Sequence, residues 1–136
     1  MHMKFELKTE ACPEASRVLV RACMAFVRIF IHHADFYELE LCLAEAVNNV
    51  VKHAYRRKDG ELEIRVAAVS PEYIQFEVSD WGKPFVLPSK NPSHEDTSGR
   101  GIYIMNRIAD EFDYVRIAEK NTVRMRKYIK EEEWKI

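Results

Sequence analysis

The sequence predicts an α+β fold in which helices cover one face of a single sheet. Two observations lead to this fold class. Short segments with a period of two, typical of strands that bury one face, precede and follow longer segments with the period of a helix. Each short segment sets apolar side chains against polar ones, which indicates that the second face of the sheet meets solvent.

Length and composition indicate one soluble globular domain that spans residues 1–136. The chain is 47% hydrophobic and 32% charged, and its net charge of −1 gives no overall field that would hold nucleic acid or a membrane. We find no apolar run of the ~20 residues that a membrane span needs, and no signal peptide. The three cysteines lack CxxC spacing and are expected to be reduced thiols of a cytoplasmic protein.

A strand and a long helix open the chain. Residues Met3 to Lys8 alternate apolar and polar side chains, and Pro13 then suits the first turn of a helix, where a missing N–H costs little. His32 and His33 follow this helix; because neighbouring residues point apart, we expect solvated or capping roles rather than a metal site. The predicted buried stripe of the helix consists of Ala15, Val18, Leu19, Ala22, Phe26, Ile29 and Phe30.

The central helix, predicted over Leu39 to Tyr55, has recognisable ends. Asp35 and Glu38 match a capping box at its start, and the charged, glycine-containing stretch from Arg56 to Gly60 predicts a turn at its end. Its apolar stripe consists of Leu39, Leu43, Ala46, Val50 and Ala54.

Polar side chains border the core face of this central helix. Glu45, Asn49 and His53 follow one another at four-residue intervals, so they stack in a second stripe beside the apolar one. A carboxylate, an amide and an imidazole in this position predict the wall of a pocket. Asn48 lies about 100° away from Asn49 around the helix, so the two asparagines have different roles.

Two alternating segments after the turn predict a hairpin, joined by Ser70-Pro71-Glu72. Continuing the period of two places Asp80 on the buried face, where a carboxylate is costly unless a partner meets it. Two interpretations of Asp80 remain open at this stage: it lines a cavity at the strand end, or it caps the turn that it forms with Gly82. The two buried faces consist of Leu62, Ile64, Val66 and Ala68, and of Ile74, Phe76 and Val78.

Residues from about 84 to 100 show no periodicity, and a loop of this length in a compact domain is more often a functional lid than a spacer. A helix is expected to begin within Ser98-Gly99-Arg100-Gly101, and the charged tail, residues 130–136, is expected to fray. The remaining apolar side chains predict a helical stripe (Met105, Ile108, Ala109 and Phe112), a strand (Val115 and Ile117) and a last strand (Val123, Met125 and Ile129).

The glycines on either side of Arg100 suit an anion site at the start of this helix. Glycine lets the backbone approach a ligand closely, the first N–H groups of a helix are unpaired, and the helix dipole favours negative charge. With the polar stripe of the central helix and the strand end at Asp80, these features predict a nucleotide site. The carboxylate would bind the amine of the base, the helix start the phosphates, and Glu45 with Asn49 the metal and water.

Three segments in this order resemble the sequence boxes of the GHKL ATPase/kinase superfamily. E-A-V-N-N-V-V-K-H-A-Y from Glu45 resembles its N box, Asp80-Trp81-Gly82 its D-x-G box, and S-G-R-G-I-Y-I-M from Ser98 its second glycine box. The form of the first box is most similar to that of the anti-sigma-factor serine kinases. The resemblance implies a two-layer sandwich of helices on a mostly antiparallel, mixed sheet, the Bergerat ATP-binding fold.

The resemblance also implies roles for individual residues. Glu45 matches the catalytic base that takes the proton of the substrate serine, and Asn49 the ligand of Mg²⁺. Asp80 would accept a hydrogen bond from the adenine amino group, and Gly82 would let the backbone pass under the base. The other implied nucleotide-binding positions are His53, Phe85, Ser98, Gly99, Arg100, Gly101, Ile102 and Thr122.

Two positions depart from the family pattern. Trp81 stands where the family usually has an acidic or small residue, and Asn121-Thr122 stand where the last strand commonly opens with Gly-Thr. By strand parity Asn121, not Thr122, shares a face with Val123. Whether Asn121 or Thr122 completes the adenine site therefore stays open.

The activity implied by the resemblance is that of an ATP- and Mg²⁺-dependent serine protein kinase acting as an anti-sigma factor. Such a protein binds a sigma factor, or switches partner and phosphorylates an anti-sigma-factor antagonist. We expect a homodimer without direct contact to nucleic acid or membrane, and the exposed side of the first helix is a candidate partner surface. One alternative is a nucleotide-binding regulator without transferase activity. A second, the catalytic module of a histidine kinase, is disfavoured because only about 35 residues precede the central helix.

Overall fold

The computed structural model describes residues 1–54, 60–84 and 100–136, with the backbone alone at residues 53, 54 and 100–102. The predicted turn at 55–59 and most of the predicted lid, 85–99, lie outside the described residues. In chain order the elements are β1 (His2–Glu10), α1 (Pro13–Phe30), α2 (Phe36–Asn49), the π-helical turn η1 (Val50–Ala54), β2 (Glu61–Val69), β3 (Tyr73–Asp80), α3 (Arg100–Ile108), β4 (Glu111–Ile117), β5 (Lys120–Tyr128) and the 3₁₀ turn η2 (Glu131–Glu133).

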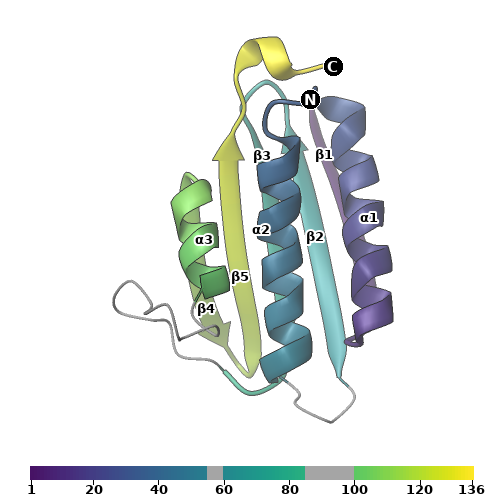
Figure 1. The fold of residues 1–136 in the computed structure, drawn as a ribbon, viewed down its shortest axis with the longest axis vertical. Coiled ribbons are helices and arrows are strands. Elements are labelled where there is room, and N and C mark those ends of the chain that lie inside the picture. The colour runs from purple at the N-terminus through teal and green to yellow at the C-terminus, as the bar shows by residue number, and fades with distance from the viewer. Residues whose placement is uncertain (55–59, 85–99) are drawn as a thin grey trace.

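The strands form one sheet in the order β1-β2-β3-β5-β4, and every pairing between the described strands is antiparallel. Helices α1, α2 and α3 lie next to one another over one face of this sheet, with α2 in the middle (Figure 1). The structure therefore confirms the predicted α+β sandwich. None of the described helices has the length and apolar character that crossing a membrane requires.

The core lies between the sheet and the three helices. The inward side chains of β2 and β3 are buried as their alternation predicts, and so are Leu39, Leu43 and Ala46 of α2 and Val50 at the start of η1. Complete burial of an aliphatic side chain of this size contributes about 1.5–3 kcal/mol, so this contact holds α2 in place on the sheet. Of the cysteines, Cys23 and Cys42 are buried, and burial raises their thiol pKa values to about 12 and about 11.

The buried stripe of α1 differs from the predicted one. Val18 and Ile29 were expected in the core but are 67% and 56% exposed, whereas Cys23, Met24 and Val27 are buried. This helix is apolar over more than one face, so its periodicity admits two overlapping stripes. Contact with the sheet and with α2 selects one of them and leaves the other partly in solvent.

The predicted capping box at the start of α2 does not form. Asp35 occupies the N-cap position without a side-chain hydrogen bond to the helix. Instead, Asp35 and Glu38 lie 3.9 Å and 3.2 Å from the ammonium of Lys127 on β5. A cation supplied by the sheet competes for both carboxylates, which removes the reciprocal bonds that a capping box needs.

Two expectations for the last third of the chain are also wrong. Phe112 belongs to β4 rather than to the stripe of α3, because the helix ends at Ile108. The tail does not fray. Trp134 pairs with Ile31 in an isolated bridge, and the backbone N–H of Lys135 donates to the carbonyl of Phe30 at 2.7 Å. The tail thus satisfies a backbone carbonyl at the end of α1, a position where a helix lacks internal partners.

Candidate functional site

The predicted polar stripe of α2 lies on the flank of the helix that faces β5 and α3. Glu38 fixes this orientation through its ion pair with Lys127 of β5, and Glu45 and Asn49 follow it at helical spacing on the same flank. Glu45 is half-buried, while Asn49 is 8% exposed. Among the residues that the structure describes, the side-chain nitrogen of Asn49 has no hydrogen-bond partner. An unpaired buried amide costs about 1–3 kcal/mol, and a ligand that hydrogen-bonds to this nitrogen would remove that cost. Asn49 is therefore a candidate for contact with a ligand.

The helix widens directly after Asn49. Residues Val50–Ala54 form a π-helical turn, so the regular spacing that would stack His53 on Asn49 is not kept, and the side chain of His53 is outside the description. The N–H of Val50 contacts the carbonyls of both Ala46 and Val47 at the changeover. Single π turns inside helices occur frequently at functional sites because they re-aim the residues that follow.

Asp80 combines the two roles that its sequence position left open. It is 2% exposed on the core face of β3, and its Oδ1 also accepts a hydrogen bond from the Gly82 N–H at 2.9 Å, which caps the turn. The side-chain nitrogen of Asn121 donates to the same Oδ1 at 2.8 Å. Burial raises the pKa of this carboxyl, against the opposing effects of these two hydrogen bonds and of the nearby Arg116.

Asn121 is the residue that the sequence left open as an alternative to Thr122 beside Asp80. Its nitrogen donates to Asp80 and to the carbonyl of Gly82 at 3.0 Å, and its oxygen accepts from Arg116 at 2.7 Å and from Tyr114 at 3.2 Å. Because a guanidinium only donates, Arg116 fixes which end of the amide is oxygen. All four hydrogen-bonding positions of the 1%-exposed amide are therefore used, and the orientation of Asp80 is held from behind.

Thr122 does not belong to this side of the sheet. It pairs with Ser79 in the ladder, one position away from the pair formed by Asp80 and Asn121, so its side chain lies on the opposite face. There its hydroxyl is 2.9 Å from the hydroxyl of Ser79. Thr122 therefore lies on the opposite face from Asp80, and the parity argument that places Asn121 on the core face is confirmed.

The corner after Asp80 is held on both sides. The carbonyl of Gly82 accepts from Arg116 at 3.2 Å as well as from Asn121. Trp81, the residue that departs from the family pattern, is 38% exposed and lies under the ammonium of Lys120 at 5.6 Å from the ring centre. Its bulk therefore points away from the buried carboxylate and does not fill the pocket side of the corner.

Within the described residues, helix α3 spans Arg100–Ile108, so Arg100 and Gly101 of the glycine-flanked segment lie at its described start. The backbone of Arg100, Gly101 and Ile102 forms its first turn, and Met105 anchors the helix with a fully buried side chain. The ends of α2 and β3 lie at the bottom of Figure 1, and the beginning of α3 is its lower end, in the lower half of the picture. Three further predicted positions, Phe85, Ser98 and Gly99, lie outside the described residues.

The site thus brings together groups of complementary chemistry. A buried carboxylate at the end of β3 suits a hydrogen-bond donor, the N-terminal end of a helix such as α3 suits an anion, and Asn49 and Glu45 lie on the neighbouring flank of α2. Within the described part of the chain, no three His, Cys, Asp or Glu side chains cluster as metal ligands.

Comparison with known proteins shows which family the chain resembles. Residues 5–127 match the model of the histidine kinase-like ATPase domain. The serine-protein kinase RsbW of Bacillus cereus (strain Q1) is 31% identical over 143 residues, covering 96% of this chain and 88% of the relative. RsbW of Bacillus anthracis (strain CDC 684 / NRRL 3495) matches with the same identity and coverage.

A solved structure shows the same fold. The RsbU and RsbW domains of Rv1364c from Mycobacterium tuberculosis superpose with a TM-score of 0.69 at 16% sequence identity. The match covers 92% of this chain but only 32% of the larger one, so the chain spans about a third of that protein's length. From the matched model and the RsbW relatives, we conclude that this chain belongs to the family of histidine kinase-like (GHKL) ATPase domains, in its RsbW-like branch of serine kinases.

Proposed function

We propose that this protein is an ATP- and Mg²⁺-dependent serine protein kinase that acts as an anti-sigma factor. In this proposal it binds a sigma factor in the cytoplasm, and it switches partner to phosphorylate an anti-sigma-factor antagonist on serine. The similarity to serine-protein kinases over 96% of the chain supports the class of reaction. We also expect a homodimer, which light scattering on the purified protein measures directly.

The observation that carries the proposal is the way in which Asp80 is presented. Both hydrogen bonds that Asp80 makes among the described residues end on Oδ1, and none is found on Oδ2. A buried carboxylate with one oxygen fixed and the other available accepts a hydrogen bond from a ligand amine. The adenine amino group has this chemistry, whereas guanine presents a carbonyl oxygen at the same position.

The flank of α2 supplies the groups for transfer. Glu45 would act as the general base that takes the proton of the serine hydroxyl as its oxygen attacks the γ-phosphorus. The first turn of α3, with Gly101 in it, would bind the phosphates through its unpaired N–H groups. Because the terminal phosphoryl group passes to the serine oxygen and ADP leaves, these residues act mainly by positioning and by charge stabilisation.

The residues present fit a magnesium ion at Asn49. The side chain is buried, one of its two polar atoms has no partner among the described residues, and the exchange of amide oxygen and nitrogen costs no shape change. An amide oxygen is a hard ligand of the kind that Mg²⁺ prefers. When bound, the ion neutralises charge on the phosphate oxygens.

A regulator that binds nucleotide without transferring phosphate is the second candidate. Glu45 argues against this candidate. Within the described residues no hydrogen bond or ion pair of Glu45 is found, so its carboxylate has no structural role there and is available for catalysis. The catalytic module of a histidine kinase is the third. It differs in its product, since phosphohistidine is acid-labile and phosphoserine is acid-stable.

A phosphotransfer assay with γ-labelled ATP and a purified antagonist protein tests the proposal. Glu45→Gln should lower transfer by about 100-fold or more, the contribution typical of a general base, while ATP binding stays unchanged. Glu38→Gln is the matched control, because Glu38 lies on the same flank of α2 but pairs with Lys127. The phosphorylated antagonist should be acid-stable, and no transfer should occur to a Ser→Ala variant of the antagonist. ATP binding without transfer by the wild-type protein would favour the regulator.

A further inference from the structure

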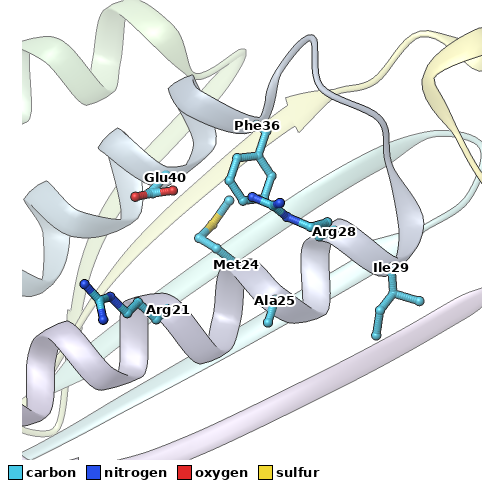
Figure 2. A pocket seen from close by; sticks show the side chains of 7 residues that line it. All are labelled: Arg21, Met24, Ala25, Arg28, Ile29, Phe36 and Glu40. Carbon is cyan, nitrogen blue, oxygen red and sulfur yellow. The ribbon is translucent and has the colours of Figure 1, made fainter.

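A groove separates α1 from α2 on the side of α2 that faces away from the candidate nucleotide site. It has a volume of about 380 Å³. Met24 and Phe36 form its floor, and charged side chains stand on the two facing helices (Figure 2). We call it the α1–α2 groove; its principal lining residues are Arg21, Met24, Arg28, Ile29, Phe36 and Glu40.

The groove continues toward the far end of α2. A second hollow of about 220 Å³ shares Arg21 and Glu40 with the first and reaches Asn48. Glu40 and Asn48 are two helical turns apart on the α1 side of α2, whereas Asn49 is on the α3 side. The two adjacent asparagines therefore serve different surfaces, and Asn48 belongs to the groove.

The lining combines apolar area with positive charge. The apolar area comes from Ile29, which is 56% exposed, and from the half-buried Phe36 above the buried Met24. The guanidinium of Arg28 lies 4.3 Å from the centre of the Phe36 ring; Figure 2 shows the two side chains next to each other. Within the described part of the chain, Arg21 makes no hydrogen bond or ion pair, and none joins Arg21 or Arg28 to Glu40. The arginines thus keep donors for carboxylates that the chain itself does not supply.

We propose that the α1–α2 groove docks an acidic amphipathic helix of a partner protein. This docking proposal rests on the proposed function only in assuming that a partner protein exists. Arg21 and Arg28 are seven residues apart on one face of α1, which places them about 10 Å apart along the helix. Two carboxylates with the same spacing match them, and apolar side chains between the carboxylates pack against the half-buried Phe36, above the buried Met24. An amphipathic helix in a groove is an established mode of peptide recognition.

The nucleotide site stays accessible while the groove is filled, because the two surfaces lie on opposite flanks of α2. Docking of a partner is therefore expected to be compatible with bound nucleotide. This arrangement lets one helix, α2, carry the chemistry on one side and the partner contact on the other.

Binding of a synthetic peptide to the 16.0 kDa chain tests the proposal. The peptide is a helix of roughly four turns with two Glu seven residues apart and Leu between them, and its control has Lys in place of Glu. NMR spectra should show shifts of the Met24 methyl and of the Arg21 and Arg28 side-chain N–H signals with the Glu peptide. The double variant Arg21→Glu/Arg28→Glu should have an affinity for the Glu peptide that is lower by at least about tenfold, and it should bind the Lys peptide instead.

The matched control is Lys4→Glu with Lys130→Glu, which makes the same charge change on exposed residues outside the groove. This control should leave peptide binding unchanged, and both double variants should bind ATP as the wild type does, which separates this proposal from the nucleotide assignment. Equal binding of both peptides, shifts confined to other surfaces, or a Kd above about 1 mM for the Glu peptide would overturn the proposal. A dimer that dissociates in Arg21→Glu/Arg28→Glu would also overturn it, because a second copy would then be the occupant.

Discussion

Replacing Asp80 by Asn should separate stability from nucleotide binding, because the two respond to this carboxylate with opposite sign. Asn has the same shape, and its Oδ1 keeps both hydrogen bonds, from Asn121 and from the Gly82 N–H. Burial raises the pKa of the Asp80 carboxyl, which means that the fold disfavours its charged form. The substitution replaces this charged group by a neutral one and removes that cost. At neutral pH we expect Asp80→Asn to be at least as stable as the wild type.

The pH dependence of stability follows from the raised pKa of Asp80. Between its unfolded value, near 3.8, and the raised folded value, the folded state binds more protons than the unfolded chain. The contribution of Asp80 to stability therefore decreases as pH rises through this window, and it stays constant above it. In urea unfolding at a series of pH values, the advantage of Asp80→Asn should grow with pH and then level off.

The same substitution should weaken ATP binding. In Asp80→Asn the new amide would keep its oxygen on Asn121 and Gly82 and turn its NH₂ toward the ligand, where a donor meets the adenine amino donor. A lost hydrogen bond with a buried unpaired donor costs about 1–3 kcal/mol, or roughly 5- to 150-fold in Kd. Isothermal titration calorimetry measures this change. Asp113→Asn is the control, since Asp113 pairs with Arg124 and its side chain is 47% exposed.

Two results would refute this reasoning. An Asp80→Asn protein less stable than wild type by more than about 1 kcal/mol at pH 7 would mean that the partners of the carboxylate outweigh its burial. Unchanged ATP affinity would mean that Asp80 does not contact the base amine.

The remaining predictions concern the network, the tail and the thiols. Asn121→Ala should destabilise the protein by about 1–3 kcal/mol in urea unfolding and weaken ATP binding, because it leaves buried donors and an acceptor unpaired; Thr122→Val, on the other face, should leave ATP binding unchanged. Trp134→Ala should lower stability by about 2 kcal/mol, since this half-buried side chain holds the tail and donates to the Ile129 carbonyl at 3.3 Å; no change in Tm would contradict the docking of the tail. A thiol reagent at pH 8 should label Cys12 in the folded protein, and the two buried cysteines only after unfolding.

Strand alternation predicted correctly which side chains face the core wherever one local period decides the outcome. Continuing the period of two from Ile74 placed Asp80 on the buried face, and parity placed Asn121 rather than Thr122 beside it. The bonds of Asn121 to Tyr114 and Arg116 depend on the register of β4 against β5, which local patterns do not contain. The amide network was therefore beyond sequence reasoning.

The other differences arise where tertiary contacts overrule a local pattern. The apolar residues of α1 admit two overlapping stripes, and contact with the sheet and with α2 decides that Val18 lies outside the core. The π-helical turn after Asn49 has no signature in composition or periodicity. The tail is charged, which predicts fraying, but Trp134 and the carbonyl of Phe30 hold it across a long sequence separation.

The measurement that tests the central claim most directly is the calorimetric titration of the wild-type protein with ATP and with GTP in the presence of Mg²⁺. Asp80, fixed through Oδ1 by Asn121, is expected to accept from the amino group of adenine and to repel the carbonyl oxygen of guanine. We predict that ATP binds at least about tenfold more tightly than GTP. Equal affinity for the two nucleotides, or no binding of ATP, would contradict the account.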